Sequence, residues 1–339
     1  MAICRKPYIT PIGELCPCQQ CPECLDNRKQ IWTNRNILES YNHKKQCFLT
    51  LTYDDENIPF ERADKIEYIC RETGKTKKKW VHTPTNFPTL NKYDAEKFIK
   101  RLRKNYGQKI RYYLVGEYGT AGERGINPHY HALLYGIDEA DTAIIENSWK
   151  KGFIHVGNTN IMSIQYVVGY VEKKTKYNKD MYEEMEITPE YSTMSLKPSI
   201  GCHEDTIQKF AQLFKQHPEY LTEYGDVPYS VYHGDRTLPF GNFLREQIRI
   251  VCDLPHDTQT FMDEETGEIT EKRIWHGKEE HKAQRLKEMQ ILQENKKIHD
   301  PKMPKDAQVS IKHYHQYKFE QSQKQFDVRQ KLKQTNHTL

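Results

Sequence analysis

The sequence predicts an α+β fold of the ferredoxin-like, split βαβ kind, in which helices pack on a mostly antiparallel sheet of four to five strands. Between residues 45 and 180, segments with the two-residue period of a strand alternate with segments that have the 3.6-residue period of a helix. Their order is β-α-β-β-α-β, followed by a further helix. Hydrophobic residues make up 36% of the chain, enough for one compact core, and charged residues make up 29%, which predicts solvated extensions beside that core.

The first half of this pattern begins with a strand at residues 47–53, which are rich in β-forming residues. A polar insertion then continues to about Thr89. Residues 93–106 repeat apolar side chains at helical spacing and are followed by Gly107, a residue that commonly ends helices. Residues 110–118 read as the second strand.

The second half begins with a glycine-rich loop at residues 119–127, which predicts a hairpin to a strand at residues 129–135. A helix is expected at residues 138–150, because an aspartate at its start can cap it. Residues 152–156 form a short strand, and residues 160–177 form the final helix.

The rest of the chain differs in texture from this core. We expect a cysteine-rich segment that leads into a basic helix at residues 25–42, then the α+β domain, an extension that packs on the core, and a charged tail with helical character. The predicted boundaries are 1–44, 45–180, 181–255 and 256–339.

Composition excludes several classes of protein. No apolar run approaches the length of a membrane span, and the first residues lack the apolar core of a signal peptide. Nine cysteines, an odd number with a tight cluster near the start, do not suit a secreted disulfide framework. We therefore expect a reducing cytoplasm.

A His-x-His pair indicates a metal site on the third strand. Side chains two apart on a strand project from the same face, so His129 and His131 can bind one divalent ion together. Glu117 ends the preceding strand, and the hairpin would bring its carboxylate close to His129. Two imidazoles and one carboxylate leave open coordination positions for phosphate oxygens and water.

The last helix carries candidate nucleophiles. At about 100° per residue, Tyr166 and Tyr170 lie one turn apart on one face. An aliphatic stripe lies on the opposite face and is expected to pack on the sheet; it consists of Ile161, Ile164, Val168 and Val171. A phenol is a weak nucleophile at its ordinary pKa, so Lys173 or Lys174 is expected to stabilise the phenolate or the leaving oxygen.

The distribution of charge is more informative than the net charge of +4. Residues 97–111 hold seven basic side chains and no acidic one, a pattern that suits a phosphate backbone. The candidate DNA-binding residues in this run are Lys100, Arg101, Arg103 and Lys104. Solvated helix faces are the alternative interpretation.

The cysteine cluster Cys16-x-Cys18-x2-Cys21-x2-Cys24 has an upstream cysteine, Cys4. Thiolates at such spacing can hold a structural zinc, for example through Cys4, Cys18, Cys21 and Cys24. Free thiols or an iron–sulfur cluster remain open alternatives.

These motifs together resemble those of the HUH endonuclease superfamily. Residues 48–52 (FLTLT) resemble its first motif, residues 128–136 (PHYHALLYG) its metal motif, and residues 166–173 (YVVGYVEK) its two-tyrosine motif. The resemblance is greatest to rolling-circle replication initiators of microviruses, especially the gokushovirus group, which also have a cysteine segment before a basic helix. It covers residues 1–200 and includes the SLKPSIG segment at residues 195–201.

The resemblance implies a replication initiator that acts in a host bacterial cytoplasm with Mg²⁺ or Mn²⁺ as cofactor. One tyrosine would nick single-stranded origin DNA and keep the 5′-phosphate, the 3′ end would prime synthesis by host helicase and polymerase, and the second tyrosine would release a circle. One position departs from the family, which often has a lysine directly before the second tyrosine where this chain has Gly169.

Two other classes of function remain open. An HUH transposase or plasmid relaxase uses the same motifs. A non-enzymatic nucleic-acid-binding module with a ferredoxin-like sheet would instead place stacking aromatic residues on the sheet and bind no metal.

Overall fold

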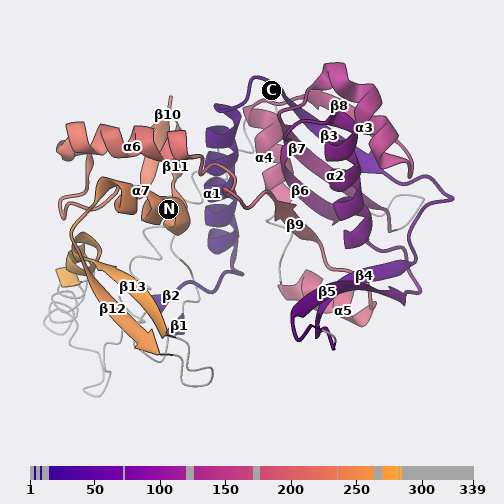
Figure 1. Cartoon of the computed structure of the whole chain (residues 1–339), viewed down its shortest axis with the longest axis horizontal. Helices are drawn as coiled ribbons and strands as arrows, with labels where there is room; N and C mark the ends of the chain where they lie inside the picture. Colours follow the sequence, from indigo (N-terminus) through magenta and orange to yellow (C-terminus); the bar gives the residue numbers. More distant parts are fainter. Residues whose placement is uncertain are drawn as a thin grey trace, which may run out of the picture. The chain divides into compact units, whose positions relative to one another are not determined.

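A computed structural model describes most of the chain, and Figure 1 shows its helices and strands. The described residues are 4, 8–9, 15–71, 73–119, 126–170, 176–234, 236–262, 269–281 and 283–284. The chain divides into two compact units, residues 28–203 and residues 1–27 with 204–339. The four predicted segments are not coextensive with these units, and that division stays a prediction.

The unit of residues 28–203 is built on a five-stranded antiparallel sheet with the strand order β8-β3-β7-β6-β9. Its strands are β3 (Gln46–Thr52), β6 (Arg111–Tyr118), β7 (Pro128–Tyr135), β8 (Ile154–Asn158) and β9 (Tyr191–Met194). The first four have the order of a split βαβ sheet, so the predicted α+β class and antiparallel sheet are confirmed. The fifth, β9, pairs with β6 from beyond the predicted domain.

One face of this sheet packs on two helices and forms the hydrophobic core (Figure 1). These helices are α2 (Lys92–Tyr106) and α3 (Thr142–Trp149), the latter preceded by the 3-10 turn η1 (Glu139–Asp141). The strand residues of this face alternate with those of the other, as in Leu49 and Leu51 of β3, which are fully buried. Phe98 of α2 and Trp149 of α3 meet edge to face with ring centroids 5.9 Å apart.

Tyr130 connects this core to the start of α2. Its hydroxyl donates to the Asn91 carbonyl and accepts from the Asn91 backbone N–H, both at 2.9 Å. The Asn91 side chain in turn caps α2, and Gly107 ends it in the left-handed conformation that glycine tolerates. A tyrosine from β7 therefore sets the position at which α2 begins.

The second face of the sheet is partly covered by α1 (Pro22–Ser40) through its residues from position 28 onward. The fully buried Glu39 pairs with Arg111 of β6 and accepts a hydrogen bond from the Gly201 N–H. Burial opposes ionisation of Glu39, but hydrogen bonds from His43, Arg111 and Gly201 outweigh it and hold the pKa of this carboxyl well below its usual range. The 195–201 segment is thereby fastened to α1.

The predicted helix over residues 160–177 is shorter than expected. The helix α4 spans Ile161–Gly169, with Asn160 as its N-cap and Tyr170 at its C-terminal end. Residues 171–175 lie outside the described residues, and α5 spans Lys176–Glu184. Gly169 is a poor helix former, which accounts for an end at this point. Ile164 and Val168 are buried as predicted, whereas Ile161 is exposed and Val171 is not described.

The predicted polar insertion before Thr89 contains a β-hairpin that the sequence analysis did not foresee. It pairs β4 (Glu61–Ile69) with β5 (Thr76–Pro84) over nine residues each. Most of its side chains are exposed, so hydrophobic alternation, the main strand signal, is weak here.

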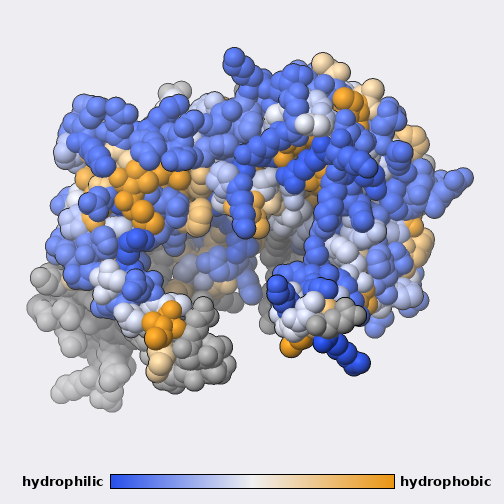
Figure 2. Space-filling model, viewed as in Figure 1, coloured by the Kyte–Doolittle hydropathy of each residue, from blue (hydrophilic) through white to orange (hydrophobic). Residues whose placement is uncertain are grey.

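The other unit contains short hairpins and two helices that pack together, α6 (Glu204–Gln216) and α7 (Gly241–Cys252), with hydrophobic residues at the surface between them (Figure 2). A buried ion-pair network joins Asp226 to Arg245 and Arg249 at 2.7 Å. The remaining elements are β1 (Tyr8–Ile9), β2 (Leu15–Cys16), η3 (Pro218–Tyr220), β10 (Ser230–His233), β11 (Arg236–Pro239), β12 (His256–Met262) and β13 (Ile269–Trp275).

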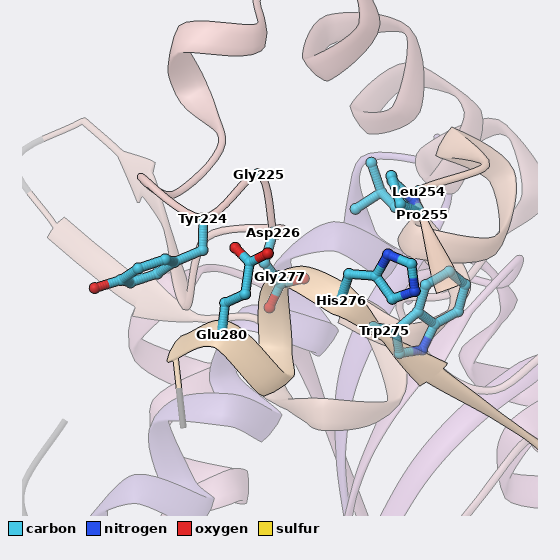
Figure 3. A pocket seen from close by; sticks show the side chains of 9 residues that line it. All are labelled: Tyr224, Gly225, Asp226, Leu254, Pro255, Trp275, His276, Gly277 and Glu280. Carbon is cyan, nitrogen blue, oxygen red and sulfur yellow. The ribbon is translucent and has the colours of Figure 1, made fainter. Parts of the chain in front are cut away.

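A pocket in this unit lies where the 224–226 turn meets the end of β13 (Figure 3). Trp275, His276 and Glu280 are among the residues that line it. The Asp226 carboxylate beside it is already engaged by two arginines, so the pocket offers no converging set of reactive groups.

The expectation of a helical tail from residue 256 is wrong for its first part. Residues 256–275 form the β12–β13 hairpin, which agrees with their alternating threonine and isoleucine residues. The tail beyond residue 284 lies outside the described residues. Within the described ranges, no helix combines the length and apolar character that a membrane span requires.

Candidate active site

Three side chains predicted to bind a metal meet on the second face of the sheet. Glu117 of β6 stands directly opposite His129 of β7, and His131 lies two residues further on the same face. Glu117 Oε1 is 2.7 Å from His129 Nε2 and 3.2 Å from His131 Nε2. Their ligand atoms all lie within 4.8 Å of one another, which suits a single divalent ion.

The other ring nitrogen of each histidine has a partner that orients the ring. His129 Nδ1 donates to the Asn127 carbonyl at 3.0 Å, and because a carbonyl only accepts, its Nε2 carries the lone pair. His131 Nδ1 lies 2.9 Å from the Thr50 hydroxyl on β3. Such partners fix the tautomer and direction of metal ligands.

The two predicted nucleophiles reach the same three residues from α4. The Tyr170 ring stacks on His131 with centroids 5.1 Å apart, and its phenol oxygen is 3.3 Å from His131 Nε2. The Tyr166 ring meets His131 edge to face at 5.2 Å and Tyr170 at 5.2 Å. The predicted shared face of the two tyrosines is present, and it points toward the metal residues.

The two phenols differ in environment. The side chain of Tyr166 is 52% exposed. Burial, followed by contacts with Tyr166 and Glu117, raises the pKa of the Tyr170 phenol well above its ordinary value. Phe48 of β3 lines the same site, stacked on His131 at 5.8 Å and edge to face with Tyr166 at 6.0 Å.

Thr50 and Phe48 are site residues that the sequence analysis did not assign. Both lie in the quoted FLTLT motif, but that motif received no chemical role. The strand period was the available signal, because residues 48, 50 and 52 alternate with the buried Cys47, Leu49 and Leu51. Their contact with β7 depends on strand pairing across 81 residues of chain.

Gly169 has a basic neighbour that sequence distance conceals. A Cβ added at Gly169 would lie 3.6 Å from the Lys29 ammonium of α1. A basic group therefore stands beside this position although residue 169 has no side chain. Lys173 and Lys174, predicted to act beside the tyrosines, lie outside the described residues.

The four candidate DNA-binding residues lie on α2, on the opposite face of the sheet from the site. Arg101 donates to the carbonyls of Ser148 and Trp149, and Arg103 donates to that of Ile110. Lys100 pairs with Glu96, and Lys104 is exposed. The two arginines thus have structural partners, and DNA binding by this set stays a prediction.

The four predicted zinc ligands also meet. The Sγ atoms of Cys4, Cys18, Cys21 and Cys24 lie within 4.8 Å of one another, and those of Cys4 and Cys21 are 3.8 Å apart. Cys18 Sγ accepts from the N–H groups of Gln20 and Cys21. Burial opposes ionisation of Cys18, but these N–H groups lower its pKa to about 7.

A further cluster of ligand-type residues, Glu39 with His43 and His203, is better explained as structural. Glu39 Oε1 accepts from both imidazoles at 3.0 Å and also from Arg111. Its Oε2 accepts from Gly201 and Arg111. A metal ion would have to displace an arginine from a buried ion pair.

Comparison with known proteins agrees with these motifs. Residues 46–175 match the family model described as replication-associated protein ORF2. The chain is 27% identical over 214 residues to replication-associated protein VP4 of Bdellovibrio phage phiMH2K, covering 57% of this chain and 60% of that protein. It is 29% identical over 212 residues to replication-associated protein ORF2 of Spiroplasma virus 4, covering 56% and 57% respectively.

A third relative, replication-associated protein ORF4 of Chlamydia phage 1, is 26% identical over 181 residues, or 47% of this chain and 38% of that protein. The matches therefore span about 60% or less of the relatives' own lengths. No solved structure matches significantly. The predicted resemblance to microvirus-type initiators is thus confirmed: residues 46–175 form a domain of the replication-associated protein ORF2 family, and the chain is related to phage replication-associated proteins.

Proposed function

We propose that this protein initiates rolling-circle DNA replication by nicking one strand of origin DNA with a tyrosine nucleophile. The observation that carries the proposal is the convergence of Tyr166 and Tyr170 on His131, beside Glu117 and His129, on one face of the sheet. The replication-associated names of the relatives favour this role over a transposase or a relaxase. A metal-type cluster beside two phenols favours it over a passive nucleic-acid-binding module.

The donor set fits a divalent cation. Two imidazole nitrogens and one carboxylate oxygen converge on one point, and Thr50 and Asn127 orient the rings from behind. Mg²⁺ or Mn²⁺ bound by Glu117, His129 and His131 would polarise the scissile phosphate. Both ions accept this mixture of nitrogen and oxygen ligands.

The proposed reaction is a transesterification. One tyrosine hydroxyl attacks the phosphorus atom, so that a tyrosine O–P bond forms and the P–O3′ bond breaks. The phenolic proton leaves with the attack, and the 3′ oxygen takes up a proton to become a free hydroxyl. The protein then holds the 5′-phosphate, and attack on a regenerated origin by the second tyrosine allows the first product to be rejoined as a circle.

Both phenols can take part because both rings contact His131 and each other. The positive charge near the leaving oxygen is assigned to Lys29, whose ammonium lies next to Gly169, together with Lys173 and Lys174. Lys100, Arg101, Arg103 and Lys104 are kept as proposed DNA contacts. Host helicase and polymerase are the proposed partners, and a host bacterial cytoplasm is the proposed compartment.

The proposal is tested with a fluorescent single-stranded oligonucleotide that carries the origin. With Mn²⁺ or Mg²⁺, the purified protein should cleave it and become covalently attached to its 5′-phosphate, which a denaturing gel and mass spectrometry of the linked peptide would show. A chelator should abolish the adduct. Cleavage that is unchanged by chelator would refute the metal part of the proposal.

For the cysteine cluster we propose a structural zinc held by Cys4, Cys18, Cys21 and Cys24. Zinc–sulfur bonds of about 2.3 Å in a tetrahedron put sulfur atoms about 3.8 Å apart, the separation that Cys4 and Cys21 show at 3.8 Å. The left-handed backbone at Gln19, with φ of 63°, directs the following N–H groups at Cys18 Sγ. Cys24 joins from the first turn of α1.

The zinc proposal predicts one tightly bound zinc per intact chain by elemental analysis. Replacing Cys18 or Cys21 with serine should remove it and lower thermal stability, because a structural metal contributes directly to folding. Cys16→Ser, a neighbouring cysteine outside the cluster, is the matched control and should retain the metal. Protein purified without chelators that holds neither zinc nor iron would contradict the idea.

A further inference from the structure

The β4–β5 hairpin has one face that the candidate active site does not use. The strand register places Ile66 opposite Lys79 and Tyr68 opposite Lys77, so these four side chains share a face. All four are exposed, Ile66 by 41% and Tyr68 by 40%. The Lys79 ammonium lies 5.6 Å from the Tyr68 ring centroid. We call this set the Lys77/Lys79 face.

The opposite face of the hairpin is already occupied. Ala63 on that face is fully buried, and Trp80 meets Tyr93 of α2 edge to face at 5.6 Å. Its charges are paired as well, since Lys65 contacts Glu96 at 2.8 Å and Lys78 contacts Glu67 at 2.6 Å. One face therefore packs toward α2, and the Lys77/Lys79 face is left for solvent or a partner.

The charges of the two faces differ in the same way. Within the described part of the chain, no carboxylate comes within ion-pair distance of Lys75, Lys77 or Lys79. The acids on the hairpin face other groups instead, as Asp64 does with Lys92. The Lys77/Lys79 face and its tip thus carry uncompensated positive charge, and Figure 2 shows the hairpin as mainly hydrophilic.

The base of the hairpin is fastened to the strand that carries the two histidines. The Asn91 side chain donates to the Glu61 carbonyl at 3.2 Å, and the Thr89 N–H donates to the Pro59 carbonyl at 2.9 Å. Asn91 is also bound by Tyr130, the residue between His129 and His131. A ligand on the hairpin is therefore held in a defined relation to the cleavage site.

We propose that the Lys77/Lys79 face binds the phosphate backbone of duplex DNA next to the nicked strand, a role that rests on the proposed function. A two-stranded ribbon fits the major groove, which is about 12 Å wide. Nine-residue strands extend about 30 Å, close to one turn of duplex. Exposed lysines suit phosphates but are depleted at protein–protein interfaces, and a single tyrosine does not supply the row of rings that single strands stack on.

The test compares the double variant Lys77→Gln/Lys79→Gln with Lys78→Gln in the intact chain. Lys78 is the matched control, because it lies between the two on the same strand but faces the other way and is paired with Glu67. Binding to a labelled origin duplex is measured against salt concentration. Loss of two phosphate contacts should make the slope of log K against log salt shallower by about 1.8 and weaken binding about tenfold or more at 0.15 M salt.

A double variant with wild-type slope and affinity would overturn the inference, and so would an equal loss in Lys78→Gln. Equal weakening on duplex and single-stranded DNA would also overturn it, because the face would then bind single strands. Adduct formation on a short single-stranded oligonucleotide, measured on the same preparations, reports the proposed function separately. Its failure in the wild-type protein would refute that function while duplex binding still tests the hairpin.

Discussion

Replacing both Tyr166 and Tyr170 with phenylalanine is expected to lower formation of the covalent DNA adduct by at least about 1,000-fold, because no hydroxyl remains to attack the phosphate. Phenylalanine keeps the ring contacts with His131, so folding and DNA binding should persist. Each single variant should still cleave once through the remaining tyrosine but fail to join the strand into a circle. Gel detection of the adduct and of circular product measures both steps.

Tyr220→Phe is the control for the double tyrosine variant. Its side chain is 52% exposed, like that of Tyr166, but it belongs to the other unit of the chain. Mapping the DNA-linked peptide in the wild-type protein would place the bond at residue 166 or 170. An adduct that survives the double substitution would assign the nucleophile to another residue.

Replacing His131 with alanine, or Glu117 with glutamine, is expected to reduce cleavage by at least about 100-fold and to weaken Mn²⁺ binding, because each change removes a direct ligand. Thr50→Val should have a smaller effect, about 10- to 100-fold in metal affinity, since it removes only the partner of His131 Nδ1. Higher Mn²⁺ concentration should partly restore Thr50→Val, and Thr50→Ser should behave like the wild type. Calorimetry and cleavage rates against metal concentration provide the measurement.

Two neighbours serve as controls for the metal variants. Thr52 lies on the same face of β3 but donates to the Phe153 carbonyl, so Thr52→Val should leave Mn²⁺ affinity unchanged. His155 stands opposite Thr50 on β8 and is outside the three-ligand cluster. Loss of cleavage in His155→Ala equal to that in His131→Ala would show that the assigned ligand set is incomplete.

Local pattern was sufficient for most of the core elements. The strands β3, β6, β7 and β8 and the helices α1, α2 and α3 lie within a few residues of their predicted bounds. The spacing of His129 and His131 on a strand, and of Tyr166 and Tyr170 on a helix, follows from backbone periodicity alone. Both pairs share a face in the structure, as predicted.

The β4–β5 hairpin and the β12–β13 hairpin were not found, because exposed strands do not alternate apolar and polar side chains clearly. The fifth strand, β9, was missed for another reason: it is four residues long and is stabilised by pairing with β6. The end of α4 at Gly169 was placed too late, since helical angle was followed past a residue that favours termination.

The sequence by itself determined the class of fold, the ligand types and the pairing of the tyrosines, because each depends on residues that are neighbours in the chain. The tertiary structure decided which groups complete the site. Thr50 reaches His131 across a strand pair, and Lys29 reaches Gly169 from another helix. Such contacts join residues far apart in sequence, and their geometry is set by strand register and helix packing, which no local pattern encodes.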